Sequence, residues 1–468
     1  MERLIRIGNV KPKCASEVKK SRLGIGFEKL DRAVFDPNKA YDKVAELGIK
    51  WVRLQSGWAR TEKIKGMYDF AWLDDIVDNL VKRSLKPWMC LAYGNGLYTP
   101  EAAKVFGAVA CPPVETEEER EAWSNYVTAL VNHFKGRVEY FEIWNEPNWF
   151  WTHVANEHQP NGTEYGLFAI ETAKAIKKGN KDAKVIGGVE SVGNLAFMNK
   201  AFKTGMGDYI DFFSFHMYTP DERKVRERMK LIRGICDMYN PNIGIIQGES
   251  GAPSRSDGNG ELSWGAWTQK KQAKVIARHA MCDMMMGVVF SSYFSCIDMI
   301  EALNGRVDDK ASYLDYGYFG ILGAEFDENG FSTGEYKPKM SYKALQVIAS
   351  VFADDVETAD LPLSFTPMHS DRVFGEDVSK DIVCSGFKKP NGSSAFVYWY
   401  SSELMTTEFE STVTLQIVPE KDLKLVDLLD GTIYQIPEKM IEDNDGSVTL
   451  KNIPIKDYPM LLTFGDFI

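Results

Sequence analysis

The sequence lacks the features that mark several broad classes of protein. It contains no block of basic residues, and its net charge is −11. A nucleic-acid backbone and an anionic membrane surface are therefore unfavourable partners. No run approaches the roughly 18 consecutive apolar residues that a membrane-spanning helix needs. We expect a protein that binds neither nucleic acid nor membranes.

Cysteine and histidine are also scarce. The seven cysteines include no Cys-x-x-Cys pair and their number is odd, which argues against a disulfide framework and against a zinc site. His153 and His158 are five apart, a spacing that suits neither a helix nor a strand, so no metal ligand is predicted. The stretch MERLIRIGNVKPKCASEVKKS lacks the apolar core of a secretory signal. We expect a cytoplasmic protein with reduced thiols, although a trimmed secreted protein would look the same.

What the sequence does contain is a regular alternation of short apolar runs and amphipathic stretches. In one of these stretches, Leu73, Ile76, Val77 and Leu80 recur with the spacing of one buried helical face. Eight strand candidates follow one another along the chain, each with a crossover segment after it. This pattern predicts an α/β fold, a (β/α)₈ TIM barrel over residues 21–353.

The C-terminal part of the chain has a different pattern. Short segments such as SSAFVYWYSS and STVTLQIVP are separated by turn residues, with no helix between them. This is typical of packed antiparallel sheets. We predict an all-β sandwich domain over residues 354–468, to which a strand within residues 1–20 is expected to add.

Polar residues end most of the predicted barrel strands. Active sites of TIM barrels gather at the C-terminal ends of the strands, so these side chains are predicted to converge on one face. In chain order they are Glu28, Arg53, Asn145, Glu146, His216, Tyr218, Glu249, Asp298 and Glu301.

The stretch EYFEIWNEPNWFW combines acids with a strand pattern. On a strand Glu142 and Glu146 share parity, and both would face the barrel interior. Glu142 lies deeper, where a barrel is packed solid, and is expected to pair with a basic residue such as Arg53. Pro147 helps to end the strand, which places Glu146 at the rim. For Asn145 to reach the site as well, the alternation must break, for example at a bulge.

Two carboxylates at one face suit the cleavage of a glycosidic bond. One carboxyl must be protonated to protonate the leaving oxygen, and the other must be ionised to meet the developing oxocarbenium ion. Glu146 ends the predicted fourth strand, and Glu249 ends the otherwise apolar seventh strand. These two residues are the predicted catalytic pair.

The same residues carry a resemblance to a known family. FEIWNEPN resembles the acid/base motif of the retaining glycoside hydrolases of clan A, and the chain is most like family 39. DFFSFHMY resembles the sixth strand of that family, and YFSCIDMIE with YGYFGIL and YKPKMSYKALQ resembles its eighth. The resemblance covers roughly residues 20 to 350. It implies a hydrolase that acts on a carbohydrate with retention of configuration and without a cofactor.

The resemblance also implies roles for individual residues. Glu146 would be the general acid/base and Glu249 the nucleophile. Asn145 would hydrogen-bond the sugar 2-hydroxyl. The residues that would hold the carboxylates and the first sugar ring are Arg53, His216 and Tyr218.

Two positions depart from the family pattern. Its xylosidases carry a histidine on the first strand where this chain has Glu28, and paired acids where this chain has Glu301 followed by Ala302. These positions touch sugar hydroxyls in the family, so Glu28 and Glu301 are candidate substrate-binding residues, and specificity for xylose is not implied. Trp144 and Trp149 could stack on sugar faces or pack within the protein, and both interpretations stay open.

The overall prediction is a retaining glycoside hydrolase that acts at the end of small glycosides or oligosaccharides. The segment 301–335 after the eighth strand would close one side of the pocket. A transglycosidase would use the same two glutamates, and a non-catalytic carbohydrate-binding barrel would be expected to have lost one of them. The sequence leaves the sugar and the linkage open, and a homo-oligomer is an open alternative.

Overall fold

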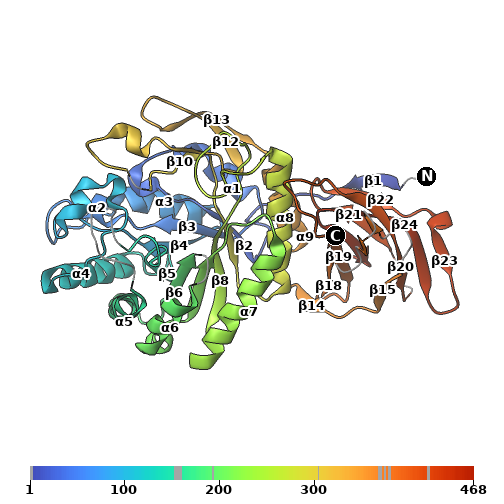
Figure 1. Cartoon of the computed structure of the whole chain (residues 1–468), viewed down its shortest axis with the longest axis horizontal. Coiled ribbons are helices and arrows are strands. Elements are labelled where there is room, and N and C mark those ends of the chain that lie inside the picture. Colours follow the sequence, from blue (N-terminus) through green and yellow to red (C-terminus); the bar gives the residue numbers. More distant parts are fainter. Residues whose placement is uncertain are drawn as a thin grey trace.

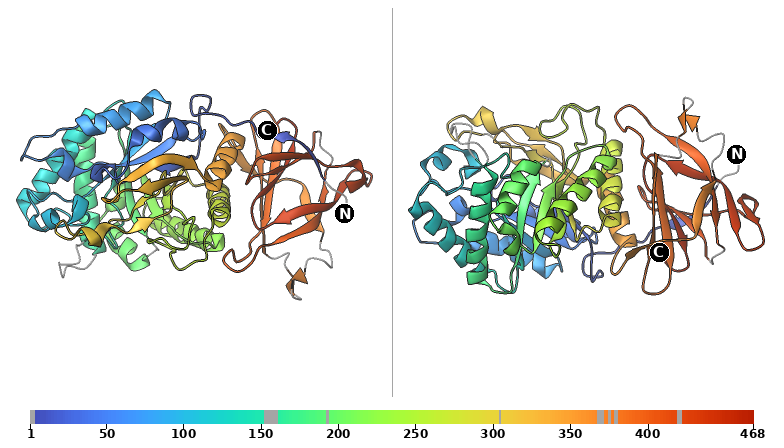
Figure 2. Two further views of the ribbon diagram at one scale, coloured as in Figure 1. Left: turned by 90° about the horizontal axis from the view of Figure 1, so that it is seen from above. Right: turned by 60° about the horizontal axis from the view of Figure 1, so that its bottom comes forward.

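The computed structural model describes residues 4–151, 161–191, 194–303, 305–366, 372–373, 376–377, 381–418 and 422–468. Over these residues the chain forms a barrel with a β-sandwich at its side (Figures 1 and 2). His153 and His158, the two histidines considered as metal ligands, lie outside the described residues. None of the described helices is long and apolar enough to cross a bilayer.

Eight parallel strands close into a ring, and each pairs with its neighbour in chain order until the last pairs with the first. The predicted (β/α)₈ barrel is confirmed. Its strands are β2 (Leu23–Gly26), β3 (Trp51–Gln55), β4 (Lys86–Leu91), β5 (Tyr140–Ile143), β6 (Lys184–Ser191), β7 (Phe212–His216), β8 (Gly244–Ser250) and β9 (Ser291–Tyr293).

Helices in the connections surround the ring (Figure 1). In α3 the residues Leu73, Ile76, Val77 and Leu80 are all buried, so the predicted apolar face is confirmed. The connecting helices are α1 (Tyr41–Ala45), α2 (Trp58–Thr61), α3 (Ala71–Lys82), α4 (Glu117–His133), α5 (Gly162–Gly179), α6 (Leu195–Lys203), α7 (Glu222–Tyr239) and α8 (Gln269–Met285).

The eighth strand is shorter than its apolar run suggests. The run extends from Gly287 to Met299, but β9 ends at Tyr293. The residues that follow stay buried because an insertion packs over them, with Ile297 bridging to Leu322. This insertion contains the short pair β10 (Met299–Ile300) and β11 (Tyr316–Gly317) and the hairpin β12 (Leu322–Phe326) and β13 (Ser332–Pro338).

Helix α9 (Met340–Val351) leads from this insertion into the sandwich, which consists of a seven-stranded and a four-stranded sheet. The N-terminal β1 pairs antiparallel with β22 and so joins the larger sheet. The larger sheet has the order β1 (Ile5–Asn9), β22 (Thr432–Gln435), β21 (Lys424–Asp427), β25 (Met460–Phe464), β19 (Ser394–Tyr400), β18 (Ile382–Lys388) and β14 (Glu357–Ala359). The smaller has the order β15 (Leu363–Thr366), β20 (Glu410–Ile417), β24 (Val448–Lys456) and β23 (Ile441–Asp443), and β16 (Arg372–Val373) pairs separately with β17 (Glu376–Asp377).

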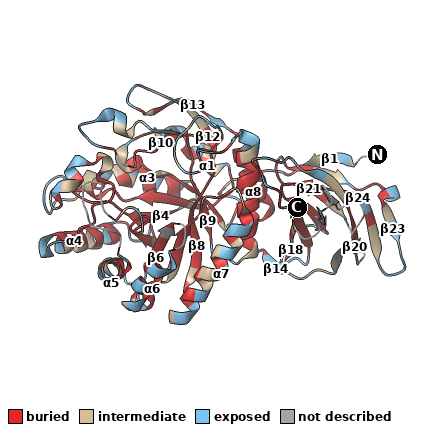
Figure 3. Ribbon diagram, viewed as in Figure 1, coloured by how far each residue is buried: buried red, intermediate tan, exposed pale blue. Residues whose placement is uncertain are grey.

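Burial follows this architecture (Figure 3). Buried residues fill the barrel strands, the inner faces of the helices and the space between the two sheets. Helix α8 differs from the other helices, because every residue from Gln272 to Met284 is buried. It lies between the barrel and the sandwich, and so has no face toward solvent over these turns (Figures 1 and 3).

Candidate active site

The backbone at the end of β5 brings two consecutive side chains into the same cavity. Trp144 and Glu146 have φ angles of 67° and 46°, in the left-handed region that non-glycine residues rarely adopt. The strand alternation therefore breaks on both sides of Asn145, and Asn145 and Glu146 both line the cavity. The predicted break is present, and it is made by two left-handed residues.

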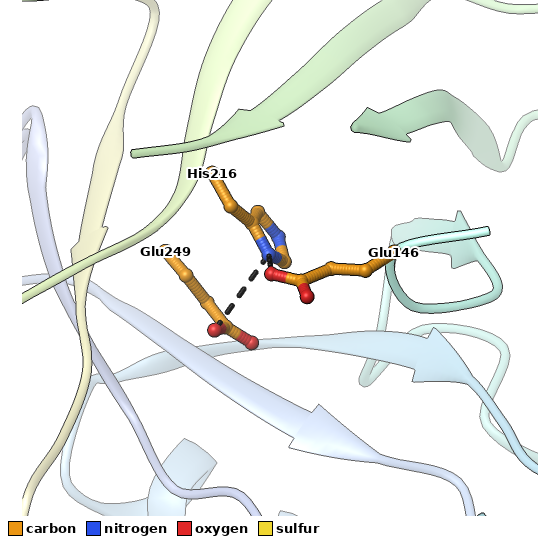
Figure 4. Close-up of side chains that lie close together, drawn as sticks. All are labelled: Glu146, His216 and Glu249. Carbon is orange, nitrogen blue, oxygen red and sulfur yellow. Dashed lines mark hydrogen bonds and ion pairs between the residues drawn. The ribbon is translucent and has the colours of Figure 1, made fainter. Parts of the chain in front are cut away.

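Glu146 and Glu249 meet at the mouth of the barrel with His216 beside them (Figure 4). His216 Nδ1 lies 2.7 Å from Glu146 Oε1 and 3.6 Å from Glu249 Oε2. One oxygen of each glutamate and one nitrogen of His216 all lie within 4.8 Å of one another. Burial works to lower the pKa of His216, but Glu249 and Glu146 outweigh it and raise that pKa.

Glu249 is held as a carboxylate by three neighbours. Arg53 Nη1 donates to Glu249 Oε1, and the Tyr218 hydroxyl donates to Glu249 Oε2 at 2.7 Å. Burial alone would raise the pKa of Glu249, but His216, Arg53 and Tyr218 together bring it below its ordinary value. Burial and the Glu249 charge raise the pKa of Tyr218 well above its ordinary value, so its hydroxyl remains a donor.

Arg53 connects the carboxylates underneath the cavity. Its side chain is fully buried, and its Nε and Nη2 donate to Glu142 Oε2 at 2.8 and 2.6 Å. Nη2 also donates to Asn145 Oδ1 at 2.8 Å, and Nη1 lies 3.3 Å from Glu28 Oε1. The predicted pairing of Glu142 with Arg53 is confirmed. A guanidinium bonded in a fixed plane holds these acceptors in a defined arrangement.

The cavity above these residues is small, about 140 Å³. Most of its polar side chains come from strand ends, while the segment after β9 contributes Glu301, Leu303 and Phe319. Its lining consists of Glu28, Lys29, Arg32, Gln55, Tyr93, Asn145, Glu146, Phe150, Tyr218, Glu249, Gly260, Glu261, Phe294, Glu301, Leu303 and Phe319.

The side of the cavity formed by the ends of β2 and β9 carries its own charges. Lys29 Nζ lies 3.3 Å from Glu301 Oε2 and donates to the carbonyl of Ile300. Burial lowers the pKa of Lys29 and raises the pKa of Glu301. Burial also raises the pKa of Glu28 to about 7, against the opposing influence of Arg53. Glu28 therefore exchanges its proton near neutral pH.

The structure places most of the predicted site residues in one group. Glu28, Asn145, Glu146, Tyr218, Glu249 and Glu301 line the cavity. Arg53 and His216 are buried behind it and contact its carboxylates. Asp298 is elsewhere, buried in an ion pair with Lys339.

The sugar-binding role considered for the two tryptophans, which the sequence left open beside packing within the protein, is not supported by their places in the structure. Trp144 is fully buried and packs edge-on against Tyr93 and Trp123, and its indole donates to the carbonyl of Phe150. It therefore has no face free for a sugar. Trp149 is 61% exposed and is not part of the cavity lining. The aromatic residue of this stretch that lines the cavity is Phe150.

Several lining residues were missed from the sequence. Gln55, Tyr93 and Phe294 lie at or just after strand ends, so the rule used for Glu249 could have found them. Lys29 and Arg32 follow the first strand within a few residues. No periodic signal marks the residues contributed by long loops, which are Phe150, Gly260, Glu261, Leu303 and Phe319.

Glu146, His216 and Glu249 also have a spacing that a metal ion could use, since their ligand atoms lie within 4.8 Å of one another. The sequence alone offers no reason to expect a metal ligand at these positions. In the structure His216 Nδ1 is engaged with Glu146, so a metal at this place would have to replace that hydrogen bond.

Comparison with known proteins shows which family a part of this chain resembles. The model of the family described as Glycosyl hydrolases family 39 matches residues 34–232, a region that contains Glu146 and His216 but not Glu249. A β-xylosidase from Caldicellulosiruptor saccharolyticus is 28% identical over 197 residues, 38% of each chain. A β-xylosidase from Geobacillus stearothermophilus is 26% identical over 171 residues, 34% of this chain and 32% of that protein. The alignments thus span only about a third of the length of these relatives.

Solved structures resemble the chain over nearly its whole length. A family 39 glycoside hydrolase from Bacteroides cellulosilyticus WH2 has a TM-score of 0.65 at 19% identity and covers 95% of this chain and 81% of that one. A monomeric β-xylosidase from Caulobacter crescentus CB15 has a TM-score of 0.61 at 16% identity and covers 98% and 97%. At this identity the likeness is one of fold.

The fold and the site together define a TIM barrel with a β-sandwich and with paired glutamates at the ends of its fourth and seventh strands. The predicted resemblance to glycoside hydrolase family 39 is confirmed.

Proposed function

We propose that the protein is a retaining glycoside hydrolase with Glu249 as nucleophile and Glu146 as general acid/base. The observation that carries the proposal is the close placement of the two carboxylates, with one oxygen of each within 4.8 Å of the other. Retaining enzymes hold their catalytic carboxyl groups about 5–5.5 Å apart, whereas inverting enzymes leave about 6.5–9.5 Å for a water. The limit of 4.8 Å applies to the nearest oxygens and not to the carboxyl carbons, and a pair of oxygens this close supports the shorter, retaining spacing.

The surroundings of the two acids suit different tasks. Glu249 receives donors from Arg53 and Tyr218, which keep it ionised and aim it into the cavity. Glu146 has no such cation of its own, and contacts only the titratable His216 among the ion pairs of the described residues. In the first step Glu249 attacks the anomeric carbon, while Glu146 gives its proton to the leaving oxygen. In the second, Glu146 takes a proton from the water that releases the sugar from Glu249.

The remaining contacts suggest how a sugar is held. Asn145 is held by a hydrogen bond from Arg53 and directly precedes Glu146 in the cavity lining, a suitable place for a hydrogen bond to the 2-hydroxyl. Glu28, Lys29 and Glu301 offer polar atoms to further hydroxyls at the opposite side. The small cavity, partly closed by Leu303 and Phe319, suits the terminal sugar of a small glycoside, and hence exo action.

The identity of the sugar is inferred from the relatives and not from the geometry of the cavity. Both curated relatives described above are β-xylosidases, which makes a β-xyloside the first candidate. A screen of aryl β-xyloside, β-glucoside, β-galactoside and α-arabinoside tests the proposal. We expect turnover of at least one, and its loss in Glu249→Gln. Binding of sugars without turnover of any would instead support a carbohydrate-binding barrel, and dominance of transfer over hydrolysis when an alcohol acceptor is added would support a transglycosidase.

A further inference from the structure

The sandwich domain reaches the cavity through a small apolar cluster that is separate from the main core. The cluster joins the loop between β8 and α8 (residues 251–268, here the β8–α8 loop), helix α8 and the connection between β19 and β20 of the sandwich. Its buried members are Ala252, Leu262, Trp267, Val275 and Leu404, and Tyr218 and Met405 pack against it.

The β8–α8 loop forms part of the cavity wall. It contributes Gly260 and Glu261 to the lining, and a Cβ at Gly260 would lie 3.0 Å from the Glu301 carboxyl. The loop is anchored at Trp267, whose indole donates to the carbonyl of Leu262 at 2.6 Å and whose backbone N–H donates to Ser256 Oγ. Since Trp267 and Leu262 both belong to the cluster, the position of the wall depends on the packing there.

Residues of the sandwich complete this anchor. Leu404 is 1% exposed although it lies in a connection between strands, because it is inserted among barrel residues. A Cβ at Gly265 would lie 2.9 Å from Met405 Sδ, so the two segments are in close contact. Lys271 Nζ bonds the carbonyls of both Ala266 and Met405, at 2.8 and 3.0 Å.

Tyr218 connects the same cluster to the reacting carboxylate. Its ring packs against the cluster, and its hydroxyl donates to Glu249 Oε2 at 2.7 Å. The ring also meets Phe294 and Phe319 edge-on, and both of these line the cavity. A shift of the cluster would therefore move Tyr218 and alter its hydrogen bond to Glu249.

The sandwich is held rigidly enough to act as a support. Arg278 of α8 is fully buried and donates to the carbonyls of Asp457, Ser402 and Tyr400 in the sandwich and to Glu222 at the start of α7. The indole of Trp399 donates to the other oxygen of Glu222. Buried charges bonded on all sides fix one orientation, because breaking any bond leaves an unpaired group.

We propose that Leu404 of the sandwich is a positioning residue for the active site, acting through the apolar cluster on the β8–α8 loop and on Tyr218. The kinetic consequence rests on the proposed function, while the structural consequence does not. On this view the sandwich is part of the support of the catalytic centre.

The test compares Leu404→Ala with Leu450→Ala in the full-length protein. Leu450 is equally buried in the sandwich but packs between strands of its smaller sheet, opposite Leu415 and Ile441. Both changes remove the same atoms from the same domain. Hydrogen–deuterium exchange of peptides covering residues 251–268 should become faster in Leu404→Ala and stay unchanged in Leu450→Ala.

The kinetic comparison uses the aryl glycoside that the unmodified enzyme turns over best. In Leu404→Ala we expect kcat/KM to fall about tenfold, as misplacement of reacting groups by a fraction of an ångström can do. The acid limb of its pH profile should move to higher pH, because Glu249 loses part of the hydroxyl donation that lowers its pKa. Leu404→Met, which conserves volume, should restore both properties.

The outcomes separate the two proposals. Equal exchange and equal pH profiles in Leu404→Ala and Leu450→Ala would overturn the role of Leu404. Absence of any turnover by the unmodified protein would overturn the proposed function, and the exchange comparison would still decide the structural role. If Leu404→Ala does not fold, Leu404→Val, a smaller truncation, gives the same comparison.

Discussion

At the scale of single residues, the site depends on giving two similar carboxylates different surroundings. Glu249 receives a guanidinium and a phenol hydroxyl, whereas Glu146 receives one imidazole nitrogen. His216 lies within reach of both, so its charge is shared between them. Such a difference in environment is the usual way in which one acid is assigned to proton transfer and the other to nucleophilic attack.

Replacing Glu146 should affect substrates according to their leaving groups. Glu146→Ala removes the proposed proton donor, so a natural glycoside, whose leaving alcohol needs protonation, should lose about 10³-fold or more in kcat/KM. An activated aryl glycoside, whose leaving group departs as an anion, should lose far less. Steady-state kinetics on both substrates check this. Equal losses on the two would contradict the assignment of Glu146.

Glu28 should make stability depend on pH near neutrality. Its pKa in the folded protein is about 7, above the ordinary value. The stability that protonated Glu28 contributes is therefore fully present below its ordinary pKa and is lost as pH rises through 7. The side chain in Glu28→Gln stays neutral at every pH. From pH 5 to pH 8, the free energy of unfolding of Glu28→Gln should therefore rise by about 2 kcal/mol relative to that of the unmodified protein.

Urea unfolding at the two pH values measures this difference. Glu328→Gln, at an exposed loop position, is the matched control and should follow the unmodified protein. A constant difference between Glu28→Gln and the unmodified protein at both pH values would show that Glu28 does not titrate in this range.

At the scale of secondary-structure elements, β8 passes unusually close to the catalytic network. A Cβ at Gly248 would lie 2.3 Å from Ser214 Oγ, 2.8 Å from His216 Nε2 and 3.1 Å from Glu142 Oε1. These three atoms have no hydrogen-bond partner among the described residues. Because Gly248 has no side chain, the side chains of Ser214, His216 and Glu142 can occupy the space next to it.

Gly248→Ala should therefore displace His216. We expect a loss of about 1–3 kcal/mol in the free energy of unfolding from overpacking, together with a lower kcat/KM. Gly234→Ala is the matched control, because a Cβ at Gly234 in α7 meets nothing within 4 Å, and alanine should stabilise the helix by about 1 kcal/mol. Thermal unfolding and kinetics check both variants. If Gly248→Ala retains full activity, the close contact is not essential for placing His216.

The elements also show where sequence reasoning succeeds and fails. The period of α3 and the order of the barrel strands could be predicted because burial on one face imposes a regular spacing. The pairing of Glu142 with Arg53 followed from the cost of burying a charge. The sequence left open whether Trp144 packs inside the protein or faces a sugar, because the strand pattern does not reveal the left-handed backbone at this residue. Glu261 and Phe319 were missed because loop positions carry no periodicity.

At the scale of the whole molecule, the barrel and the sandwich form one support for the cavity. Helix α8 is buried between them and carries Arg278, which bonds both. The part of the chain matched by the family model ends at residue 232, before Glu249 and before the sandwich. The proposed nucleophile Glu249 and the proposed positioning residue Leu404 thus lie outside the region that the family model matches.

The stereochemistry of the first product tests the central proposal most directly. Proton NMR of a reaction with an aryl glycoside can record the anomeric configuration before the released sugar mutarotates. We predict that the product first has the configuration of the substrate, because Glu146 and Glu249 are close enough for a covalent intermediate on Glu249. A first product of inverted configuration would mean that Glu249 is not a nucleophile, and would contradict the retaining mechanism.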